Sequence, residues 1–265
     1  MKKWILTVLL AAPLSWAVPA AAEDLTDVME IVKKANHTAY YEGKDGRAQV
    51  HMTIIDEQGR ERERELTILR RDTEDETDGE QKYYVYFHRP ADVREMVFMV
   101  HKHLKADDDR WLYLPALDVV KRIAASDERT SFAGSHFFYE DVSGRGIYED
   151  DHELAKTTGN YYVLENTPKE PGKVEFDSYT MYVHKKTFLP VIIEFKKGGE
   201  VYRTAKALKV EDIQGHPTVV KAEMSDSNMG GKTVMEYSSV EYDIGIPEDV
   251  FTERYLRTAP REYLK

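Results

Sequence analysis

The chain has 265 residues, and its 37 lysines and arginines against 48 aspartates and glutamates give a formal net charge of −11. This acidic balance argues against binding to nucleic acid or to an anionic membrane surface, because both attract clustered positive charge. The sequence contains no cysteine, which excludes disulfides, thiol chemistry and attachment of a lipid to a cysteine.

The first 22 residues have the three parts of a secretory signal peptide. Lys2 and Lys3 form a cationic head, an apolar run follows, and three alanines at residues 20–22 precede the acidic residues 23 and 24. Prolines interrupt the apolar run, which is shorter than the ~20 residues that a membrane span requires. We therefore predict cleavage after Ala22 and export of residues 23–265, with 35 basic and 48 acidic residues and a net charge near −13.

Residues 24–35 show apolar side chains at helical spacing, which predicts an amphipathic helix. Asp24 can cap the start of this helix, and Asn36 can help to end it. We expect its apolar stripe to pack onto a sheet.

From residue 47 the period of the apolar residues changes to two, which indicates β-strands. Residues 47–55 and 62–70 flank a turn and predict a β-hairpin. The acidic loop at residues 72–80 is predicted to be a solvated run of charge rather than a site for a hard cation.

The rest of the chain consists mainly of short apolar segments separated by glycine and proline turns. Two of them, residues 83–87 and 96–100, are apolar or aromatic on both parities, so either both faces are covered or one face lines a hydrophobic interior. With a second helix expected at residues 247–255, one curved antiparallel sheet is the simplest architecture. We expect strands at residues 82–88, 95–101, 110–114, 119–123, 153–157, 161–165, 179–184, 191–195, 201–210, 218–225 and 233–242.

One segment does not follow the strand pattern. Residues 126–144, which we call the lid segment, carry Phe132, Phe137 and Phe138 without a period of two. A loop of this length and aromatic content is unusual, because loops normally cross the surface, where water satisfies their backbone. Large rings in such a loop indicate that it lies over apolar surface, as a lid or plug over a cavity.

Residues 111–115 read WLYLP, Arg122 follows, and the block 131–141 contains SFAGS and FYED. These motifs resemble those of the LolA-like family of outer-membrane lipoprotein-sorting proteins. The leader, the N-terminal helix and the long hairpins are also similar, so the resemblance covers nearly the whole mature chain. It implies a mainly β fold at residues 23–265, a single unclosed antiparallel β half-barrel with helices and a loop lid over a concave hydrophobic cavity.

The resemblance also implies a function, that of a periplasmic carrier or chaperone for the acyl chains of lipoproteins or lipids. Such a carrier shuttles its cargo toward the outer membrane and exchanges it with an inner-membrane transporter or an outer-membrane receptor. Burial gains ~0.8 kcal/mol per methylene without a directional partner, so a shaped apolar lining and a gate are sufficient. We expect a monomer without a cofactor. The arginine that fastens the lid of LolA itself has no position that can be matched in this sequence.

The candidate lipid-binding residues are large apolar or aromatic side chains, each of which could instead be an ordinary core residue. Phe132 and Phe138 are the strongest candidates, because their segment is least suited to a core strand. Methionine suits a surface that accepts variable chains, because its side chain is flexible and polarizable. The full set is Met52, Tyr84, Phe98, Trp111, Tyr113, Phe132, Phe138, Tyr182, Ile193 and Met235.

Two other functions stay open. An RseB-like envelope sensor that regulates a membrane partner would need a second domain, for which the strand pattern gives no boundary. An envelope hydrolase would need a catalytic set, but the sequence has no glycine-x-serine-x-glycine elbow, and Glu140 and Asp141 would point to opposite faces of a strand. His101 and His103 without a fixed third ligand are a weak indication of zinc. We predict no catalytic residues and no metal site.

Overall fold

The computed structural model describes residues 24–73 and 78–265, so the predicted signal peptide and part of the acidic loop lie outside the described residues. Within these ranges the helices are α1 (Val28–Tyr40), α2 (Tyr139–Ser143) and α3 (Arg254–Arg257), together with short 3₁₀ turns that include η4 (Glu248–Phe251). The strands are β1 (Asp45–Asp56), β2 (Glu61–Asp72), β3 (Gln81–Arg89), β4 (Val97–Lys102), β5 (Asp109–Leu114), β6 (Val119–Ile123), β7 (Asp150–Thr157), β8 (Tyr161–Pro168), β9 (Ser178–His184), β10 (Pro190–Lys197), β11 (Glu200–Ile213), β12 (His216–Asp226) and β13 (Gly231–Tyr242).

The thirteen strands form one sheet in the order β6-β5-β4-β3-β2-β1-β13-β12-β11-β10-β9-β8-β7. Within each half of the sheet, neighbours in space are neighbours in sequence, and all pairs are antiparallel. The two halves join where β1 pairs with β13. Since β6 and β7 end the sheet without pairing to each other, the sheet is not closed, which confirms the predicted unclosed antiparallel architecture.

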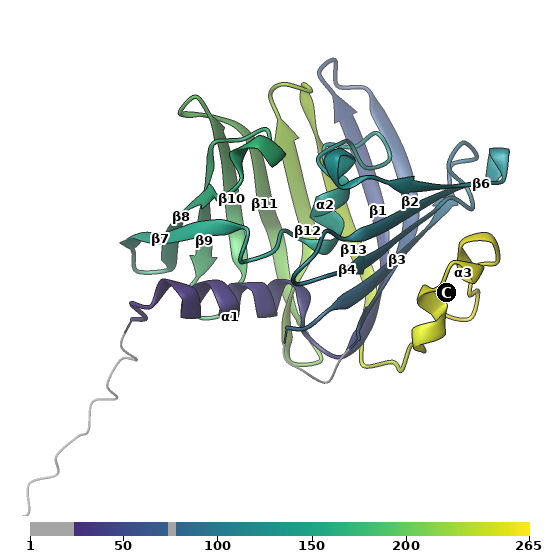
Figure 1. The fold of residues 1–265 in the computed structure, drawn as a ribbon, viewed down its shortest axis with the longest axis horizontal. Helices are drawn as coiled ribbons and strands as arrows, with labels where there is room; N and C mark the ends of the chain where they lie inside the picture. The colour runs from purple at the N-terminus through teal and green to yellow at the C-terminus, as the bar shows by residue number, and fades with distance from the viewer. Residues whose placement is uncertain (1–23, 74–77) are drawn as a thin grey trace, which may run out of the picture.

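The sheet curves around α1 and α2, whereas α3 lies on its other side (Figure 1). We call the face toward α1 and α2 the inner face and the opposite one the outer face. Along β3, Tyr83, Val85 and Phe87 belong to the inner core, and Tyr84 belongs to the outer core. Both faces of this strand are therefore covered, which explains why residues 83–87 are apolar on both parities.

The helix α1 begins and ends later than the sequence predicted. Asp27 caps it rather than Asp24, because the Asp27 carboxylate accepts hydrogen bonds from the backbone N–H groups of Met29 and Glu30. The helix continues past Asn36 to Tyr40, whose carbonyl oxygen accepts a hydrogen bond from Arg70 on β2 at 2.6 Å. A side chain of the sheet, rather than a local stop residue, thus fixes the end of α1.

The apolar stripe of α1 packs onto the inner face of β8, β9 and β10, as expected. Ile31, Val32 and Ala35 are buried there in one cluster with Leu164 and Val183. None of the helices in the described ranges is long and apolar enough to span a membrane.

The predicted helix at residues 247–255 is instead two short turns, η4 and α3. Thr252 between them has an extended backbone, with φ −117° and ψ 160°, and this interrupts the helix. Phe251, Leu256 and Leu264 are nevertheless buried on the outer face, against residues such as Tyr84. Residues 244–265, which we call the C-terminal cover, thus close the outer face of β2 to β5.

Candidate lipid-binding site

The lid segment packs its rings into the inner face of the sheet. Phe132 is buried, and its ring centroid lies 5.7 Å from that of Phe87 and 5.4 Å from that of Phe98. Tyr139 approaches Phe98 to 5.0 Å between centroids. The segment therefore covers apolar surface, as the sequence predicted.

A tight turn allows the lid segment to present these rings. The Phe132 N–H donates to the Phe137 carbonyl at 2.8 Å, and the chain between them reverses through Ala133 and Gly134. Gly134 has φ +75°, a conformation that glycine adopts without a steric penalty. The helix α2 follows at once, so the rings on both arms of this turn face the sheet.

Arg203 on β11 fastens the lid segment to the sheet. Its side chain is fully buried, pairs with the carboxylate of Asp141, and donates to the carbonyl oxygen of His136 at 3.1 Å. The guanidinium also lies 4.1 Å from the centre of the Phe138 ring, within cation–π range. No lid-fastening arginine could be matched from the sequence, because Arg203 is far from the lid segment along the chain. The pattern that could have revealed it is an arginine in phase with Ala205 and Ala207, on the buried parity of a strand.

A second arginine, Arg129 within the lid segment, ties the segment to residues after β8. Arg129 pairs with Glu140 and makes a two-pronged contact with Glu175 at 2.6 and 3.0 Å. Burial alone raises the pKa of Glu175, but the hydrogen bonds from Arg129 and Tyr202 outweigh burial and lower the pKa to about 2. The lid segment is therefore held by ion pairs as well as by its rings.

A hollow of about 350 Å³ lies between the lid segment and the middle strands of the sheet, and we call it the apolar hollow. It exists because several inner-face positions carry side chains too short to reach the cover above them. Phe137 and Val142 of the lid segment are at its border. The small residues that line it are Gly46, Ala48, Ala205, Ala207 and Ala222.

The ten residues proposed from the sequence lie in three places. Ile193 lines the apolar hollow. A second group is buried in the inner core or in the lid segment itself: Met52, Phe98, Phe132, Phe138 and Met235. A third group lies on the outer face, which differs from the expected place on the concave surface: Tyr84, Trp111, Tyr113 and Tyr182.

The outer-face group was misplaced for an identifiable reason. Strand parity shows which residues share a face, but it does not show which face is concave. Tyr84, Trp111 and Tyr113 pack under the C-terminal cover. Tyr182 alternates with the inward Met181 and Val183, and its hydroxyl lies 3.3 Å from Glu194. The residues proposed from the sequence as lipid-binding are large, whereas the apolar hollow lies where the side chains are small.

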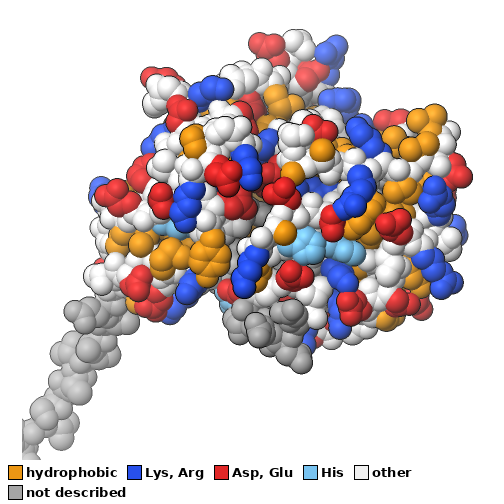
Figure 2. Space-filling view, viewed as in Figure 1, with side chains coloured by type: hydrophobic (Ala, Val, Ile, Leu, Met, Phe, Trp, Pro, Cys, Tyr) orange, Lys and Arg blue, Asp and Glu red, His pale blue; other side chains and the backbone are white. Residues whose placement is uncertain are grey.

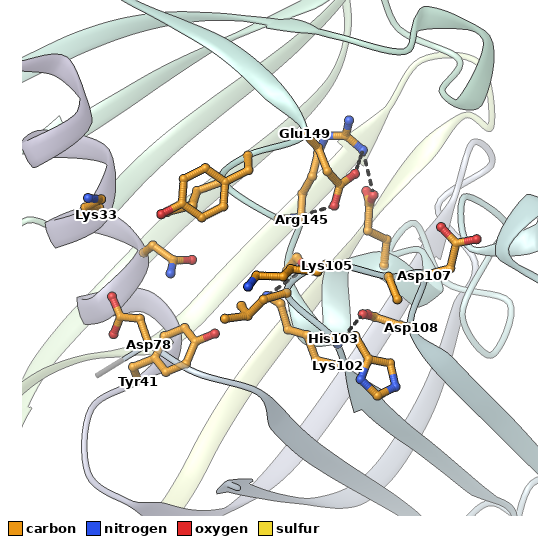
Figure 3. Close-up of a pocket in the computed structure, with 18 of the residues that line it drawn as sticks. Lys33, Tyr41, Asp78, Lys102, His103, Lys105, Asp107, Asp108, Arg145 and Glu149 are labelled. Atoms are coloured by element: carbon orange, nitrogen blue, oxygen red, sulfur yellow. Dashed lines mark hydrogen bonds and ion pairs between the residues drawn. The ribbon is translucent and has the colours of Figure 1, made fainter. Parts of the chain in front are cut away.

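A larger hollow of about 960 Å³ opens beside α1, and we call it the charged hollow. Figure 3 shows Lys33 on α1 at one side, and Lys105, Asp107, Arg145 and Glu149 from other segments around it. Its lining includes eight lysines and arginines and seven aspartates and glutamates. Charged side chains therefore make up a larger share of its lining than of the lining of the apolar hollow.

The remaining candidates for chemistry have structural partners. His101 lies on the outer face with Nε2 2.8 Å from the Phe251 carbonyl oxygen, and His103 contacts Glu80 and Asp109. Among residues 24–73 and 78–265, no group of three or more His, Cys, Asp or Glu side chains is arranged to hold a metal ion. Glu140, which was expected on a strand beside Asp141, lies with it in α2.

Charges of both signs are interspersed on the surface of the face shown in Figure 2, without a large field of one sign. An unclosed antiparallel sheet that curves around a helix and a fastened lid is the architecture of a β half-barrel. The comparisons with known proteins give the family.

A family model described as an uncharacterized protein matches residues 79–258. A DUF1329 family protein from Desulfovibrio piger is 25% identical with a TM-score of 0.78, and the match covers 86% of this chain and 96% of that one. A putative outer membrane lipoprotein-sorting protein domain from Vibrio parahaemolyticus is 26% identical with a TM-score of 0.77, covering 86% and 97%. A LolA superfamily protein from Nitrosomonas europaea has the same fold at 20% identity, with a TM-score of 0.65 and coverage of 86% and 98%.

The search of curated proteins finds no match. The family model spans more than half of the chain, and structural relatives cover most of its length. The chain belongs to the LolA-like family.

Proposed function

We propose that this protein is a periplasmic carrier that holds the acyl chain of a lipoprotein or lipid in the apolar hollow. The observation that carries this proposal is a hollow of about 350 Å³ lined by short apolar side chains beneath a lid. An acyl chain there would replace contact with water by contact with protein, which gains ~0.8 kcal/mol per methylene. The similarity to a putative lipoprotein-sorting domain supports the same reading.

The proposed mechanism is displacement of the lid segment. In the closed state Phe132 fills space against Phe87 and Phe98, and Arg203 and Arg129 hold the segment by ion pairs. Cargo chains enter by taking the place of these rings, and the lid closes again when cargo leaves. The proposal needs no catalytic step.

The proposed setting is the periplasm, with residues 23–265 as one monomeric domain. An inner-membrane transporter and an outer-membrane receptor are the proposed partners at the two ends of the route. The described residues contain one sheet and no second one. This gives no particular support to a two-domain sensor.

The first test is to identify what accompanies the protein. The full chain, including its predicted leader, is expressed in a bacterial host, and the exported protein is purified without detergent. An organic-solvent extract of this protein is then examined by mass spectrometry. We expect fatty acids, phospholipid or acylated peptide in amounts comparable to the protein. Extracts that contain only buffer components would count against a carrier.

The second test fills the hollow. Ala207 lies on the inner parity of β11 and lines the apolar hollow, and Ala155 is exposed on β7. After removal of lipid, Ala207→Phe should bind a fluorescent fatty acid at least about tenfold more weakly than the unchanged protein, because the added ring occupies the space of several methylenes. Ala155→Phe makes the same substitution outside the hollow and should bind normally. Equal affinity of both variants for the fatty acid would show that the acyl chain does not lie in the apolar hollow.

A further inference from the structure

Two lysines that line the charged hollow, Lys33 and Lys105, have no polar partner among the described residues. Most charged groups of its lining are paired with each other, for example Arg110 with Asp108 and Glu128. The ammonium groups of Lys33 and Lys105 are different, because neither contacts a carboxylate or donates a hydrogen bond to any other group within residues 24–73 and 78–265. Both side chains are exposed.

The positive charge here contrasts with the rest of the molecule. The whole chain carries a net charge of −11, yet among the described residues of this lining lysines and arginines outnumber aspartates and glutamates by eight to seven. Asp107 also has no ion pair in the described residues, and it lies on the side of the hollow near Lys173. An anion placed between Lys33 and Lys105 would give both ammonium groups a charged partner.

The charged hollow and the apolar hollow are neighbours. Thr38 near the end of α1 lines both of them. Tyr40, two residues further on, borders the apolar hollow, and its ring centre lies 5.3 Å from the ammonium of Lys102, which lines the charged hollow. The Tyr40 ring and Gly144 at the end of the lid segment thus lie between the two hollows, and we call them the wall.

This wall is closely packed. Gly144 at the end of the lid segment has φ +75°, and a β-carbon there would overlap the Tyr40 ring. The Lys102 ammonium on β4 donates to the carbonyl oxygens of Ser143 and Gly144 at 2.7 and 3.2 Å, so the part of the wall that belongs to the lid segment is tied to the sheet. Displacement of the lid segment would therefore open one hollow to the other.

We propose that the charged hollow receives the phosphate head group of a phospholipid whose acyl chain lies in the apolar hollow, with Lys33 and Lys105 as its contacts. This inference rests on the proposed carrier function and narrows its cargo. The thioether-linked diacylglycerol of a lipoprotein has no phosphate, so two lysines beside the acyl site that have no partner among the described residues favour a phospholipid over a lipoprotein.

The test compares three soluble probes by calorimetric titration of the lipid-free protein: dihexanoylphosphatidylglycerol, dihexanoylglycerol and glycerol 3-phosphate. All three probes share a glycerol backbone. The first carries both acyl chains and a phosphate, the second carries the acyl chains alone, and the third carries the phosphate alone. The variant Lys33→Glu/Lys105→Glu reverses the charge of the proposed contacts. The control Lys121→Glu/Lys156→Glu makes the same charge change at exposed positions on β6 and β7, outside both hollows.

We expect the unchanged protein to bind the phosphatidylglycerol more tightly than either partial probe. The double variant at Lys33 and Lys105 should lose at least about tenfold in affinity for it, because two charge-assisted contacts are removed, and should bind dihexanoylglycerol as before. The control variant should lose less than about twofold.

Three results would overturn the inference: equal affinity of the unchanged protein for the phosphatidylglycerol and dihexanoylglycerol, the same loss in the control variant, or binding of glycerol 3-phosphate as tight as that of the lipid. In the first two cases binding of dihexanoylglycerol would leave the carrier function intact. If neither dihexanoylglycerol nor a fatty acid bound the unchanged protein, the carrier function itself would fail.

Discussion

The two faces of the sheet are covered in different ways. The C-terminal cover closes the outer face with Phe251, Leu256 and Leu264, which pack into one apolar cluster. The lid segment closes the inner face with Phe132, but it is also tied down by Arg203 and a set of ion pairs, and hollows lie beside it.

This difference indicates two roles for two otherwise similar covers. A cover that fills its space with apolar side chains stabilises the fold, and its removal exposes core. A cover that leaves space beneath it, and relies on polar contacts at its edges, can be displaced at a smaller loss of apolar contact. Phe251 and Phe132 form a matched pair for separating these roles. Each is a buried phenylalanine, Phe251 in the C-terminal cover and Phe132 in the lid segment.

The largest effect on stability is expected for Phe251→Ala. Removal of this buried ring should lower the free energy of unfolding by about 3–5 kcal/mol, because the ring is fully buried in the outer cluster, which neither of the two hollows borders. Urea denaturation measures the loss. Binding of a fluorescent fatty acid by the folded fraction should stay within about twofold of normal. A clear change in that affinity would contradict a purely structural outer cover.

A smaller loss of stability, with a gain in binding, is expected for Phe132→Ala. The free energy of unfolding should fall by about 2–3 kcal/mol, since the lid segment can shift into the space that the ring leaves. Because incoming chains then have less to displace, affinity for the same fatty acid should rise severalfold. Fluorescence titration measures the fatty-acid affinity of this variant and of Phe251→Ala side by side. Weakened binding would show that the ring holds cargo rather than blocking its entry.

The smallest effect is the acid sensitivity of the lid contacts at Glu175. Its pKa of about 2 lies below the ~4.3 of an unfolded glutamate, so its contribution to stability is present above pH ~4.3 and is lost as the pH falls toward 2. The side chain is 33% exposed, and water screens part of the interaction with Arg129.

Glu175→Gln should therefore lower the free energy of unfolding by about 1–2 kcal/mol at neutral pH, and the difference from the unchanged protein should shrink toward zero near pH 2. Urea denaturation at several pH values measures this difference. A constant difference across the range would mean that the charge of Glu175 is not what holds Arg129.

The strands were predictable because their information is local. Each predicted strand segment overlaps an observed strand, since a period of two and the adjacent turn residues are readable within a few positions. The end of α1 was not predictable from the local sequence, because Arg70 on β2 binds it. The Arg203 contact and the apolar hollow also escaped prediction. Both depend on segments far apart in sequence, and the hollow depends on side chains that are short, such as Ala48 and Ala222.

The pairing of β1 with β13 places the seam of the sheet between the two ends of the chain. During synthesis β1 emerges early, and its partner arrives only after nearly all the other strands. Until then β1 offers an unpaired edge next to apolar side chains such as Val50 and Met52. Completion of this sheet therefore depends on a late, long-range pairing, which slows folding. Until β13 pairs with β1, the exposed edge allows aggregation.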